Sequence, residues 1–176
     1  SKNTSPMGKL SSIPYSLIKG EAKMSARLLN DGQMREFVRN GFISVKTAFP
    51  ADFHKHVFDK TEAVFEQEGN PGNNLLARIP EVQKVFDDPS VHGALASILG
   101  PGYFMEPHRH CHYRPPHSEG QQMHKDSFTR RRHHTRWVLA MYYPQDTTED
   151  MGPTAIVPGT QYYNTSASGT RDDETP

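Results

Sequence analysis

The sequence is poor in cysteine, in long apolar runs and in net charge, and each shortage excludes a class of protein. Cys111 is the single cysteine among 176 residues, so no disulfide can form within the chain and a reducing compartment such as the cytoplasm is expected. No stretch reaches the roughly 18 apolar residues of a transmembrane helix, and no secretory signal pattern opens the chain. Twenty basic and twenty acidic residues cancel, so the overall charge gives no argument for a nucleic-acid or membrane partner.

Helical periodicity occupies the first hundred residues and alternating patterns follow it. Apolar spacing predicts helices between Asn30 and Gly41, from Ala51 to Glu68, from Pro80 to Phe86, and from Val91 to Leu99 with Ser90 as its cap. Alternation and β-branched or aromatic content predict strands over residues 42–45, 103–114, 121–128, 135–143 and 154–157. Helices that precede strands indicate an α+β fold.

The ends of the chain differ in composition from its middle. Residues 1–29 are mixed and weakly periodic, which predicts a flexible N-terminal arm, and residues 166–176 form a polar tail. The folded domain is therefore expected over residues 30–165. Within it we expect Trp137 in the core and Cys111 as a buried or half-buried small residue.

The tripeptide His124-Lys125-Asp126 is the candidate metal motif. Residues two apart in a strand project to one face, so His124, Asp126 and Gln122 would point the same way. An imidazole and a carboxylate on one face can bind a single metal ion, and two histidines with one carboxylate form the facial triad of non-haem iron oxygenases. A surface salt bridge or a hydrogen bond at a strand edge is the plainer alternative, because a His-x-Asp pair is short.

Four segments in order surround this motif with a recognisable pattern. They are residues 34–43, residues 85–101 with a Leu-Gly-Pro turn, residues 122–126, and residues 142–160 with a Val-Pro-Gly-Thr ending. Together they resemble the phytanoyl-CoA dioxygenase family of Fe(II)/2-oxoglutarate oxygenases over about residues 30–164. The resemblance implies helices bracing a double-stranded β-helix, or jelly roll, with Fe(II) at its mouth and 2-oxoglutarate as cosubstrate. It also implies an oxidoreductase that hydroxylates a small organic substrate.

The same resemblance implies a role for individual residues. His124 and Asp126 match the first two iron ligands of the family. Gln122 would hydrogen-bond a ligand or the cosubstrate, and Met141, on the strand after the motif, would face the cosubstrate.

The third ligand of the family does not appear where the resemblance places it. No histidine follows His134, and Arg171 is the only basic residue after Arg136, so the distal histidine and the arginine that anchors 2-oxoglutarate have no counterpart. The barrel thus looks incomplete at its C-terminal side. We expect that the protein continues past Pro176, that a partner or a second copy completes the sheet, or that another histidine serves, with His110, His112 and His134 as candidates.

Two further constellations leave other functions open. On a strand, His108, His110 and His112 would share a face with Cys111 opposite, and His117 would supply a fourth ligand for a zinc-binding module; a polar strand that lines or rims the barrel is the plainer alternative. A basic loop over residues 130–136 is either solvated or an anion contact for the substrate through Arg131 and Arg132. A catalytically inactive jelly roll that acts as a binding or scaffold protein is the remaining alternative.

Overall fold

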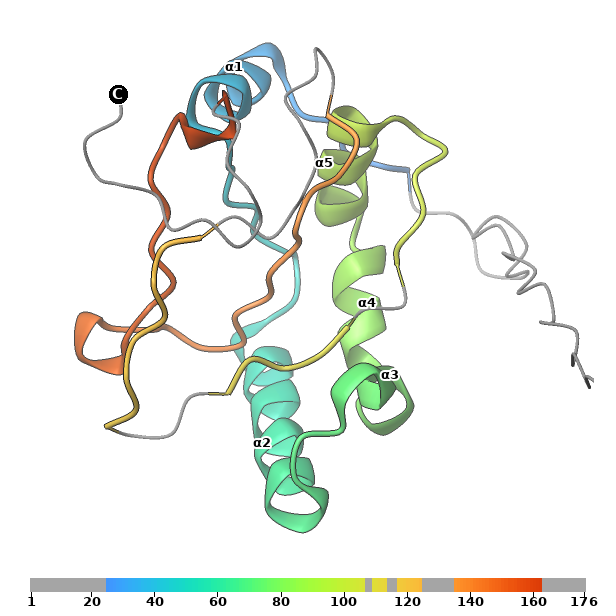
Figure 1. Cartoon of the computed structure of the whole chain (residues 1–176). Helices are drawn as coiled ribbons and strands as arrows, with labels where there is room; N and C mark the ends of the chain where they lie inside the picture. The colour runs from blue at the N-terminus through green and yellow to red at the C-terminus, as the bar shows by residue number, and fades with distance from the viewer. Residues whose placement is uncertain (1–24, 107–108, 114–116, 125–134, 163–176) are drawn as a thin grey trace, which may run out of the picture.

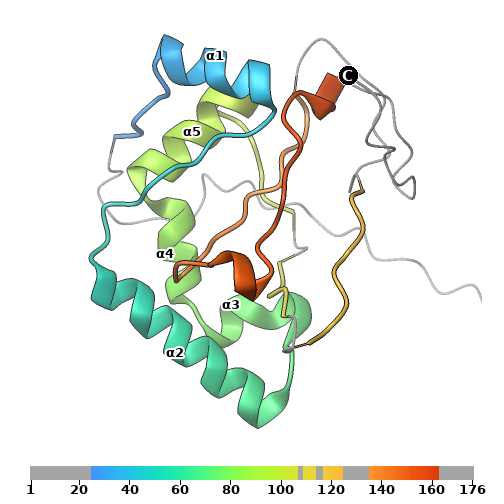
Figure 2. The same cartoon turned by 90° about the vertical axis from the view of Figure 1, so that its left-hand side faces the viewer.

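The computed structural model describes residues 25–106, 109–113, 117–124 and 135–162. In Figure 1 the later segments pass between the first helix at the top and the second at the bottom, and in Figure 2 most of the helices lie along one side of these segments. The helices are α1 (Asp31–Asn40), α2 (Ala51–Glu68), α3 (Leu75–Arg78), α4 (Glu81–Asp87) and α5 (Pro89–Leu99). Among the residues described, three short 3-10 turns accompany them, η2 (Gly72–Asn74), η3 (Glu149–Met151) and η4 (Thr160–Tyr162).

Helix α1 begins and ends at the residues that the sequence predicts. The Asn30 side chain accepts from the Gln33 N–H and the Gln33 side chain accepts from the Asn30 N–H, both at 3.0 Å, which is a complete capping box. Gly41 ends the helix in the left-handed region at φ +82°, where a side chain would be strained.

The last carbonyls of α1 are satisfied by a segment from the far end of the described chain. The Gly159 N–H donates to the Asn40 carbonyl at 2.9 Å, and the Gln161 amide donates to the Val38 carbonyl at 2.8 Å. The Tyr162 hydroxyl also donates to Val38. Because helix C-termini leave their final carbonyls without partners inside the helix, these bonds both stabilise α1 and fix the segment that follows Val157.

Helices α2, α3 and α4 enclose the buried apolar cluster of the fold. Val57 of α2 packs with Leu75, Ile79 and Val82, and Val57 and Ile79 are the most completely buried large side chains. Phe53 and other half-buried residues cover the edges of the cluster. The bounds predicted for α2 and its inward face are confirmed, whereas the short α3 falls outside the sequence prediction because four residues carry no periodic signal.

The start of α5 corrects the sequence prediction. The N-cap is Asp88 and not Ser90: an Asp88 carboxylate oxygen accepts from the Ser90 N–H at 2.8 Å. Pro89 occupies the first helical position, where its missing N–H costs nothing, so the cap lies two residues earlier than predicted. Asp88 is only 4% exposed, and its second oxygen accepts from the Ala48 N–H at 3.1 Å, which ties the chain before α2 to α5.

The predicted strands have no counterpart among the residues described. Residues 42–45, 103–106, 109–113, 121–124, 135–143 and 154–157 run without helix or strand. The jelly roll therefore stays a prediction. The expectation that Trp137 lies in the core is wrong, since the residue is 40% exposed. None of the helices in the described ranges has the length and apolar content needed to cross a membrane.

Residues 25–29, at the end of the predicted arm, lie against α5. The Arg27 N–H donates to the Pro89 carbonyl at 2.9 Å and the Leu29 N–H donates to the Ser97 hydroxyl at 3.0 Å. Gly93 allows this approach, because a methyl group there would lie 2.0 Å from the Arg27 carbonyl oxygen. The remainder of the arm and the tail lie outside the described residues.

Gly93→Ala should destabilise the protein by about 1–3 kcal/mol, because the new methyl group meets backbone that must shift. Thermal unfolding measures the change. Gly102→Ala is the matched control, since nothing lies within 4 Å of a methyl group there, and a change of no more than about 0.5 kcal/mol is expected. Equal effects of the two substitutions would refute the close approach of residues 25–29 to α5.

An ion pair joins α2 to α4. Lys60 Nζ lies 2.7 Å from a carboxylate oxygen of Glu81, and the two side chains are 39% and 18% exposed. The hydrogen bond from Lys60 lowers the pKa of Glu81. A lowered pKa in the folded state contributes stability above the ordinary glutamate pKa, and this contribution is lost as the pH falls through the folded-state value.

Glu81→Gln should therefore cost up to about 1 kcal/mol at neutral pH, and the difference from the wild type should vanish in acid. Urea unfolding at the two pH values measures it. Asp59→Asn, which breaks the exposed pair of Lys55 and Asp59, should have a smaller effect at neutral pH. A cost for Glu81→Gln that persists below the ordinary glutamate pKa would show that the ion pair is not its source.

Candidate functional site

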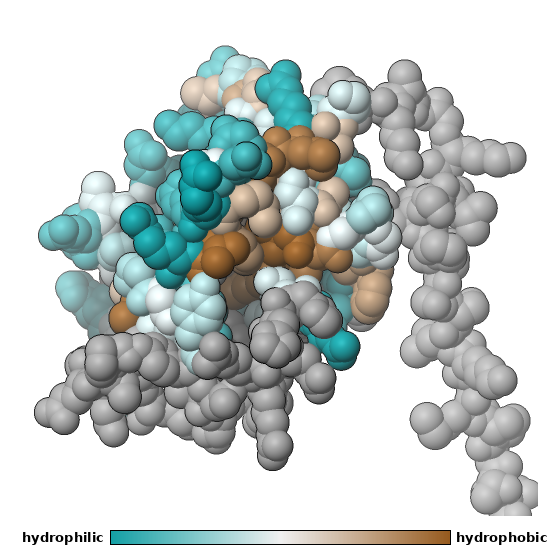
Figure 3. Space-filling model, turned by 90° about the horizontal axis from the view of Figure 1, so that it is seen from above, coloured by the Kyte–Doolittle hydropathy of each residue, from teal (hydrophilic) through white to brown (hydrophobic). Residues whose placement is uncertain are grey.

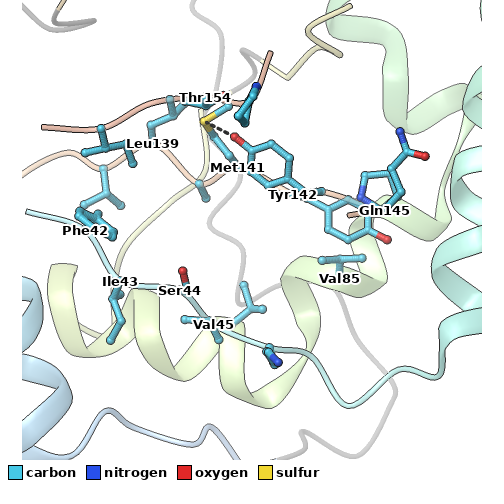
Figure 4. Close-up of a pocket in the computed structure, with 18 of the residues that line it drawn as sticks. Phe42, Ile43, Ser44, Val45, Val85, Leu139, Met141, Tyr142, Gln145 and Thr154 are labelled. Atoms are coloured by element: carbon cyan, nitrogen blue, oxygen red, sulfur yellow. Dashed lines mark hydrogen bonds between the residues drawn. The ribbon is translucent and has the colours of Figure 1, made fainter. Parts of the chain in front are cut away.

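A cleft of about 1650 Å³ opens between the extended segments and the helices. One wall is residues 42–47, the opposite wall is residues 138–146 with residues 152–157, and α2, α4 and α5 close the base. Figure 4 shows Phe42, Ile43 and Val45 on one side and Leu139 and Met141 on the other. In the view from above, apolar side chains gather in a hollow among polar ones (Figure 3).

Consecutive residues of the segment 138–146 line the cleft. Leu139, Ala140 and Met141 are exposed along it, whereas Tyr142 is half-buried and also packs against the apolar cluster of the helices. The alternation that the sequence predicts for these residues does not divide them between cleft and core, because all four line the cleft. Met141, the predicted cosubstrate contact, is among them, and its sulfur accepts from the Tyr143 hydroxyl at 3.6 Å.

The described part of the metal motif lines the same cleft. Gln122 and His124 both contribute to its lining, together with Gln121 and Met123. The structure thus brings three predicted site residues, Gln122, His124 and Met141, to one cleft. The second predicted ligand, Asp126, lies outside the described residues, and so do the predicted substrate contacts Arg131 and Arg132.

The hydrogen bonds of His124 define the state of its imidazole ring. Nδ1 lies 2.8 Å from the Gln122 backbone carbonyl, which only accepts, so Nδ1 carries the proton. Nε2 then presents its lone pair, and the Gln121 amide lies 3.3 Å from it. A metal-ligating histidine commonly donates its other N–H to a carbonyl in this way. The His124 ring therefore fits Fe(II), provided that the Gln121 amide turns away from Nε2.

The histidines after residue 107 do not assemble a complete metal site in the part of the chain that is described. His110 and His112 share a face, with ring centroids 4.5 Å apart. No group of three or more His, Cys, Asp or Glu side chains suited to a metal ion occurs within the described ranges. His108 and His134, which the zinc module and the third iron ligand invoke, lie outside those ranges.

Cys111 is a half-buried small residue, as expected. It packs against the apolar cluster, and its carbonyl accepts from the Asn70 side-chain amide at 3.0 Å. Burial raises the pKa of its thiol. The Arg109 N–H donates to the Asn73 side chain at 3.0 Å, and the Tyr113 ring lies 5.4 Å from that of Phe65. Residues 109–113 are therefore held to the end of α2 by side chains from the turn after it.

A polar chain that the sequence does not reveal crosses the base of the cleft. His54 of α2 has its Nδ1 2.7 Å from the Tyr142 hydroxyl oxygen and its Nε2 3.2 Å from the Thr47 hydroxyl oxygen. All three residues line the cleft. Burial raises the pKa of Tyr142 to about 12, so its hydroxyl stays protonated. His54 and Tyr142 are 88 residues apart, and no local pattern predicts such a pair.

The amino-acid sequence matches the model of one protein family. The family model for phytanoyl-CoA dioxygenase (PhyH) matches residues 37–176, which is most of the chain. The chain therefore belongs to the phytanoyl-CoA dioxygenase family, as the four sequence segments predict. Searches of the curated proteins and of the solved structures found no match.

Cys111 should react slowly with iodoacetamide, because a raised pKa leaves less thiolate at any given pH and the sulfur is half-buried. The rate should rise with pH and reach half its plateau above the ordinary thiol pKa. Mass spectrometry of the alkylated chain follows the reaction, with glutathione as the exposed reference thiol. A midpoint equal to that of glutathione would contradict the burial of Cys111.

Proposed function

We propose that this protein is a non-haem Fe(II)/2-oxoglutarate-dependent oxygenase that hydroxylates a small organic substrate in the cleft. Membership in the phytanoyl-CoA dioxygenase family supports the class of reaction. The observation that carries the proposal for this chain is His124, which lines the cleft and whose Nδ1 lies 2.8 Å from a backbone carbonyl, the contact that the second nitrogen of a metal-ligating histidine commonly makes. The fold that we propose around it is the jelly roll.

The residues of the motif have separate tasks in this proposal. His124 and Asp126 would hold the metal, and Gln122 and Met141 would contact the cosubstrate. Iron with 2-oxoglutarate supplies the oxidation chemistry when bound, and the protein supplies position and a water-poor cavity. The hydrogen bond from Nδ1 to the Gln122 carbonyl fixes the ring orientation of His124.

The walls of the cleft favour an apolar substrate. The cavity is lined by the apolar side chains of Phe42, Ile43, Val45 and Leu139. Pockets of this kind exclude water, while a few polar groups fix the orientation of the ligand. Arg131 and Arg132 remain the proposed contacts for an anionic substrate group. We propose no nucleic-acid or membrane partner.

The proposal requires a third ligand and a basic anchor for 2-oxoglutarate. A segment beyond Pro176, a partner or second copy that completes the sheet, or another histidine would supply the missing imidazole, with His110, His112 and His134 as candidates. The zinc module stays an alternative proposal, since its ligand His108 lies outside the described residues.

His124→Ala should weaken metal binding by more than about tenfold, since removing a ligand costs at least as much as disturbing the residues that orient it. Binding of Mn(II), an oxygen-stable substitute for Fe(II), is measured by electron paramagnetic resonance. Iron-dependent formation of succinate from 2-oxoglutarate is measured in parallel. His56→Ala is the matched control, because His56 is exposed on α2 and does not line the cleft.

Two outcomes would refute the iron site. One is metal binding that His124→Ala leaves unchanged. The other is metal binding that His110→Ala abolishes while His124→Ala does not, which would favour the zinc module. Metal binding through His124 without succinate formation, even when the third ligand is provided, would favour an inactive binding protein.

A further inference from the structure

The two walls of the cleft are joined through a single imidazole ring. Thr47 ends the wall of residues 42–47, and Tyr142 belongs to the opposite wall of residues 138–146. His54 of α2 stands between them, bonded to Tyr142 at 2.7 Å and to Thr47 at 3.2 Å. We call Thr47, His54 and Tyr142 the strut.

Each end of the strut is attached to the helical layer. Beside Thr47, the Ala48 N–H donates to the buried carboxylate of Asp88 at 3.1 Å. At the other end, the Tyr142 ring packs against the apolar cluster of α2, α3 and α4. The middle is confined as well, because the rings of Phe53 and His54 meet edge-on with centroids 5.6 Å apart. Because both of its ends are fixed to the helices, the strut holds the two walls of the cleft at one separation.

Both ring nitrogens of His54 make hydrogen bonds within the protein, so neither can also bond to a ligand. An imidazole has two nitrogens, and in this structure each faces a hydroxyl. In one tautomer Nδ1–H donates to Tyr142 and the Thr47 hydroxyl donates to Nε2; in the other tautomer both bonds are reversed. Either way a ligand that bonded to His54 would have to break the strut. His54 therefore acts on the position of the walls and not on the ligand.

We propose that the strut sets the width of the cleft and thereby selects ligands by their cross-section. Breaking either hydrogen bond releases one wall from the other and admits broader molecules. The inference rests on the proposed function only in taking the cleft as the place where the substrate binds; it needs neither iron nor 2-oxoglutarate.

Three variants break the strut at different points. Tyr142→Phe and His54→Gln both remove the bond between α2 and the far wall, since a glutamine amide reaches the position of Nε2 but leaves that of Nδ1 empty. Thr47→Val removes the other bond and keeps the shape of the side chain. Tyr113→Phe is the matched control, because its ring lies on Phe65 and does not line the cleft.

The probes are decan-1-ol and adamantan-1-ol, which share ten carbons and one hydroxyl but differ in width. Dissociation constants come from displacement of a fluorescent naphthalene sulfonate dye. In each strut variant the dissociation constant of adamantan-1-ol should fall about fivefold relative to that of decan-1-ol. This is the size of effect that loss of one hydrogen bond produces. Tyr113→Phe should leave the ratio unchanged. The double variant of Tyr142→Phe with His54→Gln should shift it no further than either alone.

Thermal unfolding of each variant measures its loss of stability, which is compared with the change in the ratio of the two dissociation constants. A variant that only loosens the fold weakens both probes equally and leaves the ratio at the wild-type value, and that result in Thr47→Val and Tyr142→Phe would overturn the proposal. A wild type that binds neither probe would overturn it too. Absence of iron-dependent succinate formation would bear on the proposed function alone, because the probes bind without metal or cosubstrate.

Discussion

Burial of Val57 and Ile79 between α2, α3 and α4 is the constraint on which the rest of the described structure depends. The later segments reach the same apolar cluster with single side chains, Cys111 from one segment and Tyr142 from another. Apolar burial has no direction of its own, so it brings these segments to the helices without fixing where they lie along them. Their positions must come from other contacts.

Side-chain hydrogen bonds provide those positions. Asn70 bonds to the backbone of residue 111, His54 bonds to Tyr142, and Gln161 bonds to the end of α1. Each bond joins a polar side chain to a segment distant in the sequence. Such bonds are individually worth about 1 kcal/mol, but they are directional, so they determine register where burial does not. The walls of the cleft are placed in this way.

The sequence predicts the parts of the structure that local rules govern. Capping and periodicity predict the bounds of α1 and α2, and the structure confirms them. The predicted cap of α5, Ser90, is wrong because a serine before an apolar run fits the same rule as the aspartate two residues earlier. Pairs such as His54 with Tyr142 lie beyond local rules, since neither residue carries a signal for a partner 88 positions away.

The candidate metal site and the strut place different demands on one cleft. At His124 the demand is chemical: a carbonyl accepts from Nδ1, so Nε2, which the Gln121 amide approaches at 3.3 Å, is the nitrogen that would coordinate. At His54 both nitrogens face hydroxyls that belong to the two walls, and the same type of side chain acts as a spacer. Family membership indicates the class of chemistry in which His124 would take part, whereas the role of His54 follows from its own contacts with Thr47 and Tyr142.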